Sequence, residues 1–466
     1  MHNALLLFVG HDHAPTTSKR EPVVSHAVQK YLTYRQASLY TLLMFIGPYK
    51  RLIARSPNLL GFGFMMVFFS SMGQTYFVGV FGPQIQSEFN LSHTAWSSVY
   101  MIGTLASAML FFWSGPLIDR YKLPGFTRAV CILMVVACAF MPFVSGPVTL
   151  VLGIFLLRHS GQALASHVGV TSMGRYFDRG RGRAIAIASL GQSAGEAVLP
   201  FLAVAAIAVV GWRWTYAGVA VILAITSLST VGWLLRGYEK LHAKHLESLR
   251  TKTDNVKSNV VSWTRKMVLR DIRFYLLLPA MTATSMIVTA FFFHHLTIAE
   301  VKQWDARWIT GNYLLYAGAS MAATLFAGSL IDRFRARFVI RFIMIPLALA
   351  ALTIGIADHY LWVLLYMILM GLHVGFSHTS ASALYPELYG VEYLGSIKSM
   401  VGVFSVLSSA IGPVLIGMLF DRGIPIQTIC IVIAIYVVAC NMLLILALRI
   451  VPTFVPQPTI QNKTSS

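Results

Sequence analysis

Long apolar runs dominate the chain and alternate with mostly short polar connections. A helix needs roughly 20 apolar residues to cross a bilayer, and twelve runs are about that long. They cover residues 59–82, 95–117, 127–145, 148–173, 184–209, 213–235, 274–298, 309–330, 338–357, 360–384, 395–420 and 425–448. Because most connections are short, consecutive helices are expected to be antiparallel. The pattern predicts an all-α integral membrane protein with twelve transmembrane helices.

Two longer polar stretches divide this pattern. One is a basic N-terminal stretch, and the other is a linker with ten Lys or Arg and four Asp or Glu, which separates the spans into six and six. We expect a cytoplasmic N-terminal tail (1–57), an N-terminal six-helix bundle (58–235), a cytoplasmic linker (236–273), a C-terminal six-helix bundle (274–450) and a cytoplasmic tail (451–466).

Lys and Arg are concentrated in alternate short loops, and this asymmetry predicts the orientation, because cytoplasmic loops carry the excess of positive residues. With the N-terminus inside, the short inner loops hold twelve: Arg120, Lys122, Arg128, Arg175, Arg179, Arg181, Arg183, Arg333, Arg335, Arg337, Arg341 and Lys398. The outer loops hold four: Arg213, Lys302, Arg307 and Arg422. Both termini are therefore expected in the cytoplasm, and we expect the membrane to be a bacterial inner (plasma) membrane.

The two six-span halves share repeated motifs. The sequence Gly115-Pro-Leu-Ile-Asp119-Arg120 recurs 213 positions later as Gly328-Ser-Leu-Ile-Asp332-Arg333. Near the fourth and tenth spans, Ser166-His167 recurs as Ser377-His378. Two parallel repeats of six helices are typical of a transporter whose substrate site lies at the interface between the repeats.

The composition excludes a soluble enzyme. AVILMFWYC make up 56% of the residues and only 11% are charged, against about 25% in soluble domains. The net charge of +19 is explained by basic loops at an anionic membrane surface, so no nucleic-acid partner is expected. The four cysteines lie in apolar runs without metal-ligand spacing, and no phosphate loop, HExxH or GxSxG motif is found. We expect no metal, no cofactor and no enzymatic activity.

The Gly-x-Leu-x-Asp-Arg loop after the second span, repeated after the eighth, resembles the signature loop of the major facilitator superfamily. The resemblance covers about residues 58–450 and implies the major facilitator fold, in which two six-helix bundles alternate between two open states. The expected gating residues are Gly115, Asp119, Arg120, Gly328, Asp332 and Arg333, whose ion pairs would break as the cytoplasmic side opens. The alternative is that the arginines only set topology. Both copies depart from the family pattern, since Lys122 and Arg335 replace its second glycine.

Two charged residues lie deep in spans, Arg158 in the fourth and Glu196 in the fifth. A charge at a helix centre costs about 2.5–3.5 kcal/mol on insertion scales, so both are functional candidates. Helix geometry places them within ~5 Å of each other in depth. One hypothesis is that they pair and that a substrate anion or a proton competes for the pair; the alternative is a permanent structural ion pair. Glu196 is the expected proton carrier.

The family resemblance also implies that spans one, four, seven and ten line the cavity. Polar residues on these spans are therefore the expected substrate-binding residues: Gln74, Tyr76, Arg158, Gln162, Thr289, His294 and His378. His167 joins them because the Ser-His pair is repeated in both halves and imidazole titrates near neutral pH. For each histidine, the alternative is a hydrogen-bonded packing role.

The stretch from Arg175 to Arg183 and the small-residue span after it are similar to the corresponding part of monocarboxylate and oxalate/formate porters. Those families use charged residues in the first or eighth span, which are missing here. We expect a monomer in the lipid bilayer that carries a small solute by secondary active transport. We expect an organic anion because Arg158 lies in a cavity-lining span, with proton coupling as a hypothesis. The alternatives are efflux of amphipathic drug-like solutes and a non-transporting membrane sensor or scaffold.

Overall fold

A computed structural model describes Gly47 and residues 49–177, 181–236, 238–239, 242–243, 263–390 and 394–450. The chain divides into two compact units, residues 1–56 and 57–466. The described end of the first unit is a short helix, Tyr49–Arg55. The helices discussed below belong to the second unit.

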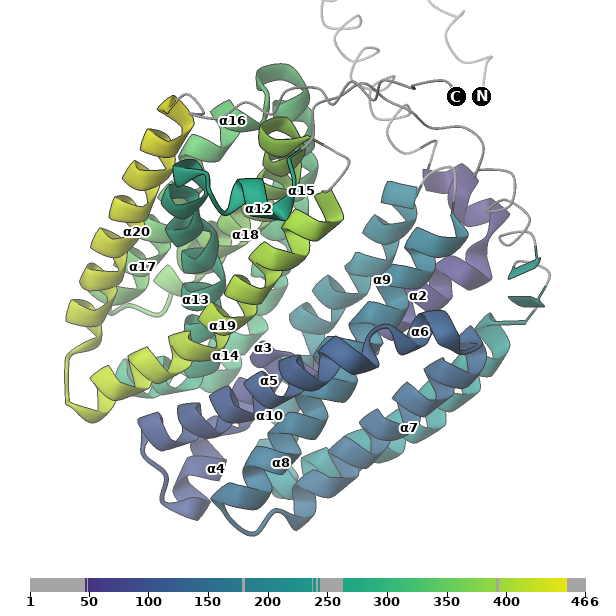
Figure 1. The fold of residues 1–466 in the computed structure, drawn as a ribbon. Helices are drawn as coiled ribbons and strands as arrows, with labels where there is room; N and C mark the ends of the chain where they lie inside the picture. The colour runs from purple at the N-terminus through teal and green to yellow at the C-terminus, as the bar shows by residue number, and fades with distance from the viewer. Residues whose placement is uncertain are drawn as a thin grey trace, which may run out of the picture. The chain divides into compact units, whose positions relative to one another are not determined.

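The N-terminal half of the second unit runs from α2 to α10 and the C-terminal half from α12 to α20, and Figure 1 shows each half as its own group of helices. The first half contains α2 (Pro57–Phe69), η1 (Ser70–Gly73), α3 (Thr75–Val78), η2 (Gly79–Phe81), α4 (Gly82–Phe89), α5 (His93–Ser114), α6 (Leu117–Arg120), α7 (Leu123–Phe140), η3 (Met141–Phe143), α8 (Pro147–Leu157), η4 (Arg158–Ala165), α9 (Ser166–Tyr176) and α10 (Arg181–Leu234). The second contains α12 (Arg265–Val268), α13 (Ile272–Val301), α14 (Ala306–Gly311), α15 (Tyr313–Phe334), α16 (Ala336–Val339), η5 (Ile340–Phe342), α17 (Met344–Ile356), α18 (Trp362–Tyr389), α19 (Leu394–Asp421) and α20 (Ile426–Arg449).

All twelve predicted apolar runs lie in helical segments, and the predicted all-α membrane class is confirmed. The fifth and sixth runs share α10, which turns at Gly211, where φ is 79°. Glycine adopts this left-handed conformation without steric cost. Among the described residues, nine helices are long and apolar enough to cross a membrane, or ten if a bent pair that begins at Tyr49 is counted.

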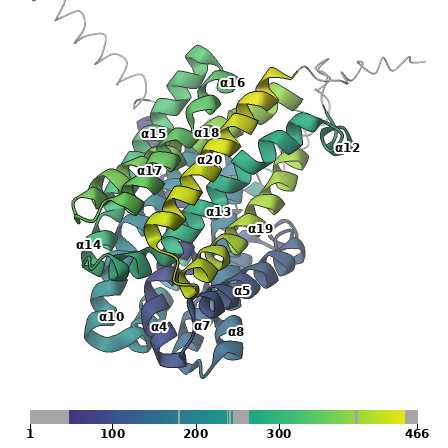
Figure 2. The ribbon, with the colours of Figure 1, turned by 90° about the vertical axis from the view of Figure 1, so that its left-hand side faces the viewer.

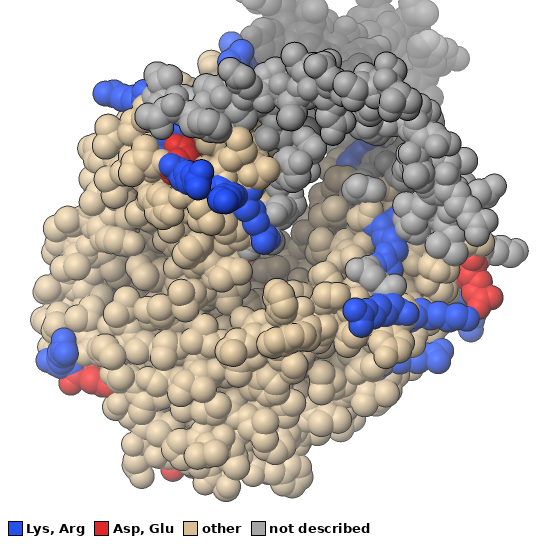
Figure 3. Space-filling view, viewed as in Figure 1, with Lys and Arg blue, Asp and Glu red and all other residues tan. Residues whose placement is uncertain are grey.

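Large apolar side chains cover the outward faces of these helices. Phe112 on α5 is 77% exposed and Val432 on α20 is 56% exposed. Water-soluble proteins rarely expose apolar patches of this kind, whereas lipid tails cover them without cost. Figure 3 shows the same pattern: a broad band across the face in view carries no charged side chain. The helices therefore turn apolar surface both toward each other and toward lipid.

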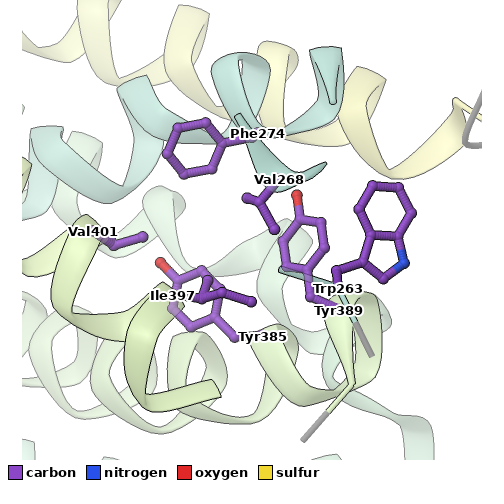
Figure 4. Close-up of a cluster of buried hydrophobic side chains, with 7 residues drawn as sticks. All are labelled: Trp263, Val268, Phe274, Tyr385, Tyr389, Ile397 and Val401. Carbon is purple, nitrogen blue, oxygen red and sulfur yellow. The ribbon is translucent and has the colours of Figure 1, made fainter. Parts of the chain in front are cut away.

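The second unit has two ends, which we call the linker side and the far side. The linker side carries α6, the end of α9 and α12, and the far side carries the α4–α5 turn and α14. The turn of α10 at Gly211 also lies on the far side, because the N–H of the next residue, Trp212, donates to Gln84 of α4 at 3.1 Å. At the linker side the N–H of Trp263 donates to the carbonyl of Tyr389 at 2.9 Å. Figure 4 shows these two rings with the rest of a buried cluster: Val268, Phe274, Tyr385, Ile397 and Val401. The end of the linker is thereby fastened to the ends of α18 and α19.

The two halves meet toward the far side. α5 packs against α19, as Figure 2 also shows, and α13 packs against α3, η2 and α4. Their backbones approach closely at Gly79 and Gly417, where an added Cβ would lie 2.9 Å from the Phe292 carbonyl oxygen and 2.8 Å from that of His93. Toward the linker side, Figure 3 shows the surface hollowed between the halves. The far side is thus closed by direct contact, while a hollow opens on the other side.

Candidate functional site

Span one is broken at the level where it meets span four. After η1, Gln74 is extended (φ −85°, ψ 154°) before the chain resumes as α3. Span four contains a π-helical segment, η4, which packs against η1. Two glycines allow this approach, since a Cβ on Gly161 would lie 2.7 Å from the backbone nitrogen of Gly73. Broken and π-helical segments free backbone groups to bind side chains or ligands.

The guanidinium of Arg158 binds the backbone at this break. Its Nη1 donates to the carbonyl of Gly73 at 2.9 Å and lies 3.5 Å from Oγ1 of Thr75. Its guanidinium stands 5.0 Å from the centre of the Tyr100 ring, and the residue is 1% exposed. Among the described residues it forms no ion pair, so the hypothesis that Arg158 pairs with Glu196 is wrong. The carbonyl left free by the broken helix binds the guanidinium instead.

Glu196 faces the C-terminal half. The Tyr316 hydroxyl lies close to its carboxyl group. The hydroxyls of Tyr313 and Tyr76 are close enough to interact with its charge. Glu196 itself is half-buried, whereas the three tyrosines are at most 4% exposed. Tyrosines from both halves therefore lie near one half-buried carboxyl group.

Next to Tyr313, His295 on α13 is hydrogen-bonded to two tyrosine hydroxyl groups at once. Its Nδ1 lies 2.6 Å from the Tyr313 hydroxyl and its Nε2 lies 2.5 Å from the Tyr366 hydroxyl. The ring of Phe292 packs on His295, Tyr313 and Tyr316, with centroid distances of 4.8, 5.1 and 4.9 Å. These side chains link α13, α15 and α18 into one polar and aromatic core.

A stripe of hydroxyl side chains on α13 leads from the linker side to this core. Thr282, Ser285 and Thr289 are half-buried and stand three and four residues apart. Residues at this spacing share one face of a helix. Phe292 lies on the same face and packs on Tyr313 and Tyr316, the tyrosines near Glu196. Thr289, one of the predicted binding residues, therefore lies on the face that leads to Glu196.

His294 lies on the opposite face of α13. Its Nε2 is 2.9 Å from the carbonyl of Pro413 and 3.4 Å from Oγ of Ser97, and the residue is 1% exposed. Its ring also stacks edge-on with that of His93. In this conformation His294 belongs to the contact that closes the far side, and its predicted role in solute binding would require that contact to open.

Asp421 ties the two halves together at the same end. Its carboxylate accepts the backbone N–H groups of His93 at 2.9 Å and Thr94 at 2.8 Å. These donors lie in the first turn of α5, whose unpaired N–H groups and dipole favour an anion. The last residue of α19 thus caps a helix of the other half. This contact could not be predicted from the sequence, because Asp421 resembles an ordinary charged residue at a helix end.

Four other candidates lie in or near the broken region of spans one and four. Gln74 is at the break itself and is 9% exposed. Tyr76 follows it and donates to Oγ of Ser71 at 2.9 Å. Gln162 on η4 and His167 on α9 are half-buried, and His167 packs against the ring of Phe111. The structure therefore places Gln74, Tyr76 and Gln162 near Arg158, with His167 further toward the linker side.

His378 is exposed on α18. It shares a helix face with Ala381 and Tyr385, which pack toward the buried cluster that contains Val401 of α19. Leu365 lies near the opposite, outward face of the same helix and is 39% exposed. His378 therefore lies away from the outward face of α18, and its predicted role in solute binding stays a prediction.

The predicted gating loops lie on the linker side. Gly115 ends α5, and the Nη1 of Arg175 donates to the carbonyl of Ile118 at 3.2 Å, which ties this loop to the end of α9. Arg120 and Arg333 are exposed, and Gly328 lies within α15. The side chains of Asp119 and Asp332 lie outside the described residues, so the gating role of these two loops stays a prediction.

Glu88 and Arg213 fasten the far-side end of the N-terminal half. The Arg213 guanidinium lies 2.6 Å from the Glu88 carboxylate, and the Trp212 indole N–H donates to the same group at 2.6 Å. The hydrogen bond from Arg213 lowers the pKa of Glu88 below its usual value.

Among the described residues, no cluster of three His, Cys, Asp or Glu could hold a metal ion.

Comparisons with known proteins agree with this architecture. The sequence model of the Major Facilitator Superfamily matches residues 4–158, 63–413 and 307–465. A crystal structure of the nucleoside transporter NupG is similar with a TM-score of 0.62 and 12% identity over 84% of this chain and 100% of that chain. The D323A mutant of NupG gives 0.61 and 12% over 84% and 99%. No curated protein sequence matches the chain. At 12% identity the structural likeness establishes the fold alone.

Proposed function

Because the chain belongs to the Major Facilitator Superfamily, we propose that it carries a small organic anion together with a proton across the membrane by alternating access. Its family and fold make it an integral membrane transporter of a small solute and not an enzyme. We further propose that it works as a monomer in a bacterial inner membrane. The excess of Lys and Arg in the inner loops supports an orientation with both termini and the linker side in the cytoplasm.

The position of Glu196 carries the proton part of the proposal. It is a half-buried carboxyl that lies near Tyr76 of its own half and near Tyr313 and Tyr316 of the other half. A carboxyl taken out of water is stabilised in its neutral form, and hydroxyls can bind either form. Since α10 and α15 must separate when the far side opens, the surroundings of Glu196 change between the two states of the transporter. That change is what proton coupling requires.

The charge of Arg158 supports an anionic solute. Arg158 is buried against Tyr100 and has no carboxylate partner among the described residues, so no neighbouring side chain neutralises its charge. Two unit charges about 10 Å apart interact by about 1.7 kcal/mol at an effective dielectric constant of about 20. An anion offsets Arg158 while Glu196 is protonated, and an ionised Glu196 would repel it. Proton and anion binding therefore favour each other, and this coupling is reciprocal.

The likeness of the stretch from Arg175 to Arg183 to monocarboxylate and oxalate/formate porters supports small carboxylates as the first solutes to test. The fold neighbour NupG is a nucleoside transporter, so a nucleoside belongs in the same panel as a neutral planar solute. Lipophilic cations represent the efflux alternative. A sensor or scaffold without transport activity would respond to none of them.

The test uses purified protein in liposomes that hold a pH-sensitive dye, with protein-free vesicles as the blank for passive entry of weak acids. A carboxylate that is carried should acidify the lumen. Glu196→Gln should reduce this acidification by at least about tenfold, because the amide cannot release a proton. Glu239→Gln, which changes an exposed glutamate on the linker side, is the matched control and should behave as the unaltered protein.

Two results would overturn the proposal. One is a response to lipophilic cations or nucleosides with none to carboxylates, which would reassign the solute. The other is acidification of equal size in the Glu196→Gln variant, which would remove Glu196 from proton coupling.

A further inference from the structure

We infer that Tyr313, His295 and Tyr366 form a proton path that connects Glu196 with the far side through the core of the C-terminal half. This inference rests on the proposed proton coupling of Glu196. In the described conformation the far side is closed to solute by the packing of α5 on α19 and of α13 on η2. The path would let a proton reach Glu196 from the far side by a route that is separate from the solute route.

The centre of the path is an unbroken pair of short hydrogen bonds. Nδ1 of His295 is 2.6 Å from the Tyr313 hydroxyl and Nε2 is 2.5 Å from the Tyr366 hydroxyl. All three residues are at most 1% exposed. One ring nitrogen of a neutral imidazole is a donor and the other an acceptor. Tyr313, His295 and Tyr366, which we call the triad, therefore form a directional chain of hydrogen bonds that can take up a proton at one end and release one at the other.

One end of the triad points toward Glu196. Tyr313 lies one turn before Tyr316 on α15, and residues three apart are neighbours on a helix surface. The Tyr316 hydroxyl lies close to the Glu196 carboxyl, and the charge of Glu196 acts on Tyr313 as well. Phe292 packs on both tyrosines and separates this end from the α13 stripe. The hydroxyls are thus held beside the carboxyl that the proposed coupling uses.

The other end of the triad lies near a far-side hollow. Tyr366 is in the second turn of α18 and interacts with Cys430 of α20. Cys430 packs directly on Gly355, where an added Cβ would lie 2.5 Å from the cysteine Cβ. The carbonyl of Gly355 accepts a hydrogen bond from Nζ of Lys302, which lines a hollow of about 700 Å³. Cys430 of α20 and Gly355 of α17 thus link the surroundings of Tyr366 to Lys302 at this hollow.

The transfer conserves protons at every group. A proton taken up by the Tyr366 hydroxyl oxygen displaces the hydroxyl's own proton onto Nε2 of His295. Nδ1 then releases its proton to the Tyr313 hydroxyl oxygen, and the original Tyr313 proton passes to the Glu196 carboxylate, the charged group that acts on Tyr313. Each hydroxyl gains one proton and loses one. His295 ends as the other neutral tautomer, with its proton on Nε2, and it must return to the Nδ1-protonated tautomer before the next transfer.

The titratable groups that face the triad are few. His294 adjoins His295 on α13, Cys430 faces Tyr366 from α20, and Glu196 faces Tyr313 from α10. Lys302 acts on Cys430 from the far side. Among these neighbours in the described residues, Glu196 is the one carboxylate, so it is the natural acceptor for a proton that leaves Tyr313.

The experiment separates proton transfer from solute binding in reconstituted vesicles. Tyr366→Phe removes the far hydroxyl and keeps the ring. Uptake of the transported carboxylate driven by a pH gradient should fall at least about tenfold. Counterflow of labelled carboxylate at equal pH on both sides needs no proton release from Glu196 and should stay within about twofold of the unaltered protein. Tyr385→Phe, which removes a buried hydroxyl elsewhere on the same helix, is the control and should change neither rate.

The possible results are distinguishable. Gradient-driven uptake at the unaltered rate in Tyr366→Phe would overturn the proton path, and so would an equal loss of uptake and counterflow, because that pattern indicates a packing role only. His295→Gln, which can bond both hydroxyls without relaying a proton, should repeat the selective loss of uptake. If the unaltered protein itself shows no gradient-driven uptake, or if Glu196→Gln retains it, the proposed function fails before the path is tested.

Discussion

Removing the carboxylate of Asp421 should destabilise the closed far side. In the described conformation this group accepts the N–H groups of His93 and Thr94 across the boundary between the two halves. When α19 and α5 separate, these bonds must break, and water replaces them. Their net strength therefore acts entirely on the equilibrium between far-side-closed and far-side-open states, and not on the stability of either half.

The magnitude follows from the geometry. Losing an N-cap carboxylate costs about 0.5–2 kcal/mol, and a negative charge at a helix N-terminus contributes about 0.3–1 kcal/mol. The site is exposed, and Ser92 still accepts the N–H of Ala95 from the same helix start, so part of the capping survives. We expect Asp421→Ala to shift the equilibrium by about 1–2 kcal/mol, or about 5–30-fold toward the open far side.

Distances between spin labels on the far side measure this shift. Ser145→Cys places a label on the N-terminal half and His359→Cys places one on the C-terminal half, both at exposed positions. The four native cysteines are buried, which favours labelling of the introduced thiols. Asp421→Ala should increase the population of long distances. Asp305→Ala is the matched control, because Asp305 caps α14 within one half by accepting the N–H of Arg307.

The reasoning is refuted if the distance distribution of Asp421→Ala equals that of the unaltered protein. It is also refuted if Asp305→Ala produces the same change, because a helix cap confined to one half has no direct effect on the contact between the halves.

Two further predictions concern stability. Gly161→Ala should lower the thermal unfolding temperature in detergent by an amount equivalent to about 1–3 kcal/mol, because the added Cβ would press on Gly73. In the control, Gly174→Ala in the same span, the added Cβ meets nothing within 4 Å, so the unfolding temperature should stay unchanged or rise. Equal effects of the two substitutions would contradict the close contact. Because Arg213 lowers the pKa of Glu88 in the folded state, the stabilisation by this pair is present above the usual carboxyl pKa of 4.5 and is lost as the pH falls through the folded value. Glu88→Gln should therefore destabilise the protein by at most about 1 kcal/mol near pH 7 and have a smaller effect near pH 3.5, and a loss of the same size at both pH values would contradict the ion pair.

The spans could be predicted because the bilayer imposes a simple length rule. A run such as 425–448 must become a helix, since no other single segment satisfies its backbone in lipid, and the structure gives α20 within one residue at each end. The repeat of Gly115 to Arg120 after the eighth span likewise indicated two similar halves. The turn at Gly211 also fell between two predicted spans.

The partners of the deep charges could not be predicted. Depth along the membrane follows from counting residues, and it placed Arg158 and Glu196 at similar levels. Rotation about the helix axis does not follow, because helices that face lipid on one side and protein on the other are apolar all round and give no phase. The break after Gly73 was also invisible, since Gly and Gln occur in intact membrane helices as well.

The sequence by itself determined the membrane class, the helical segments, the two-half organisation and which residues are charged at depth. These features depend on transfer of side chains and backbone from water to lipid, which is local to each segment. Only the tertiary structure decided that Arg158 binds the Gly73 carbonyl, that Glu196 meets tyrosines of the other half, and that Asp421 caps α5. Those contacts join residues up to 328 positions apart, and they depend on how helices rotate and pack against one another, which no single segment specifies.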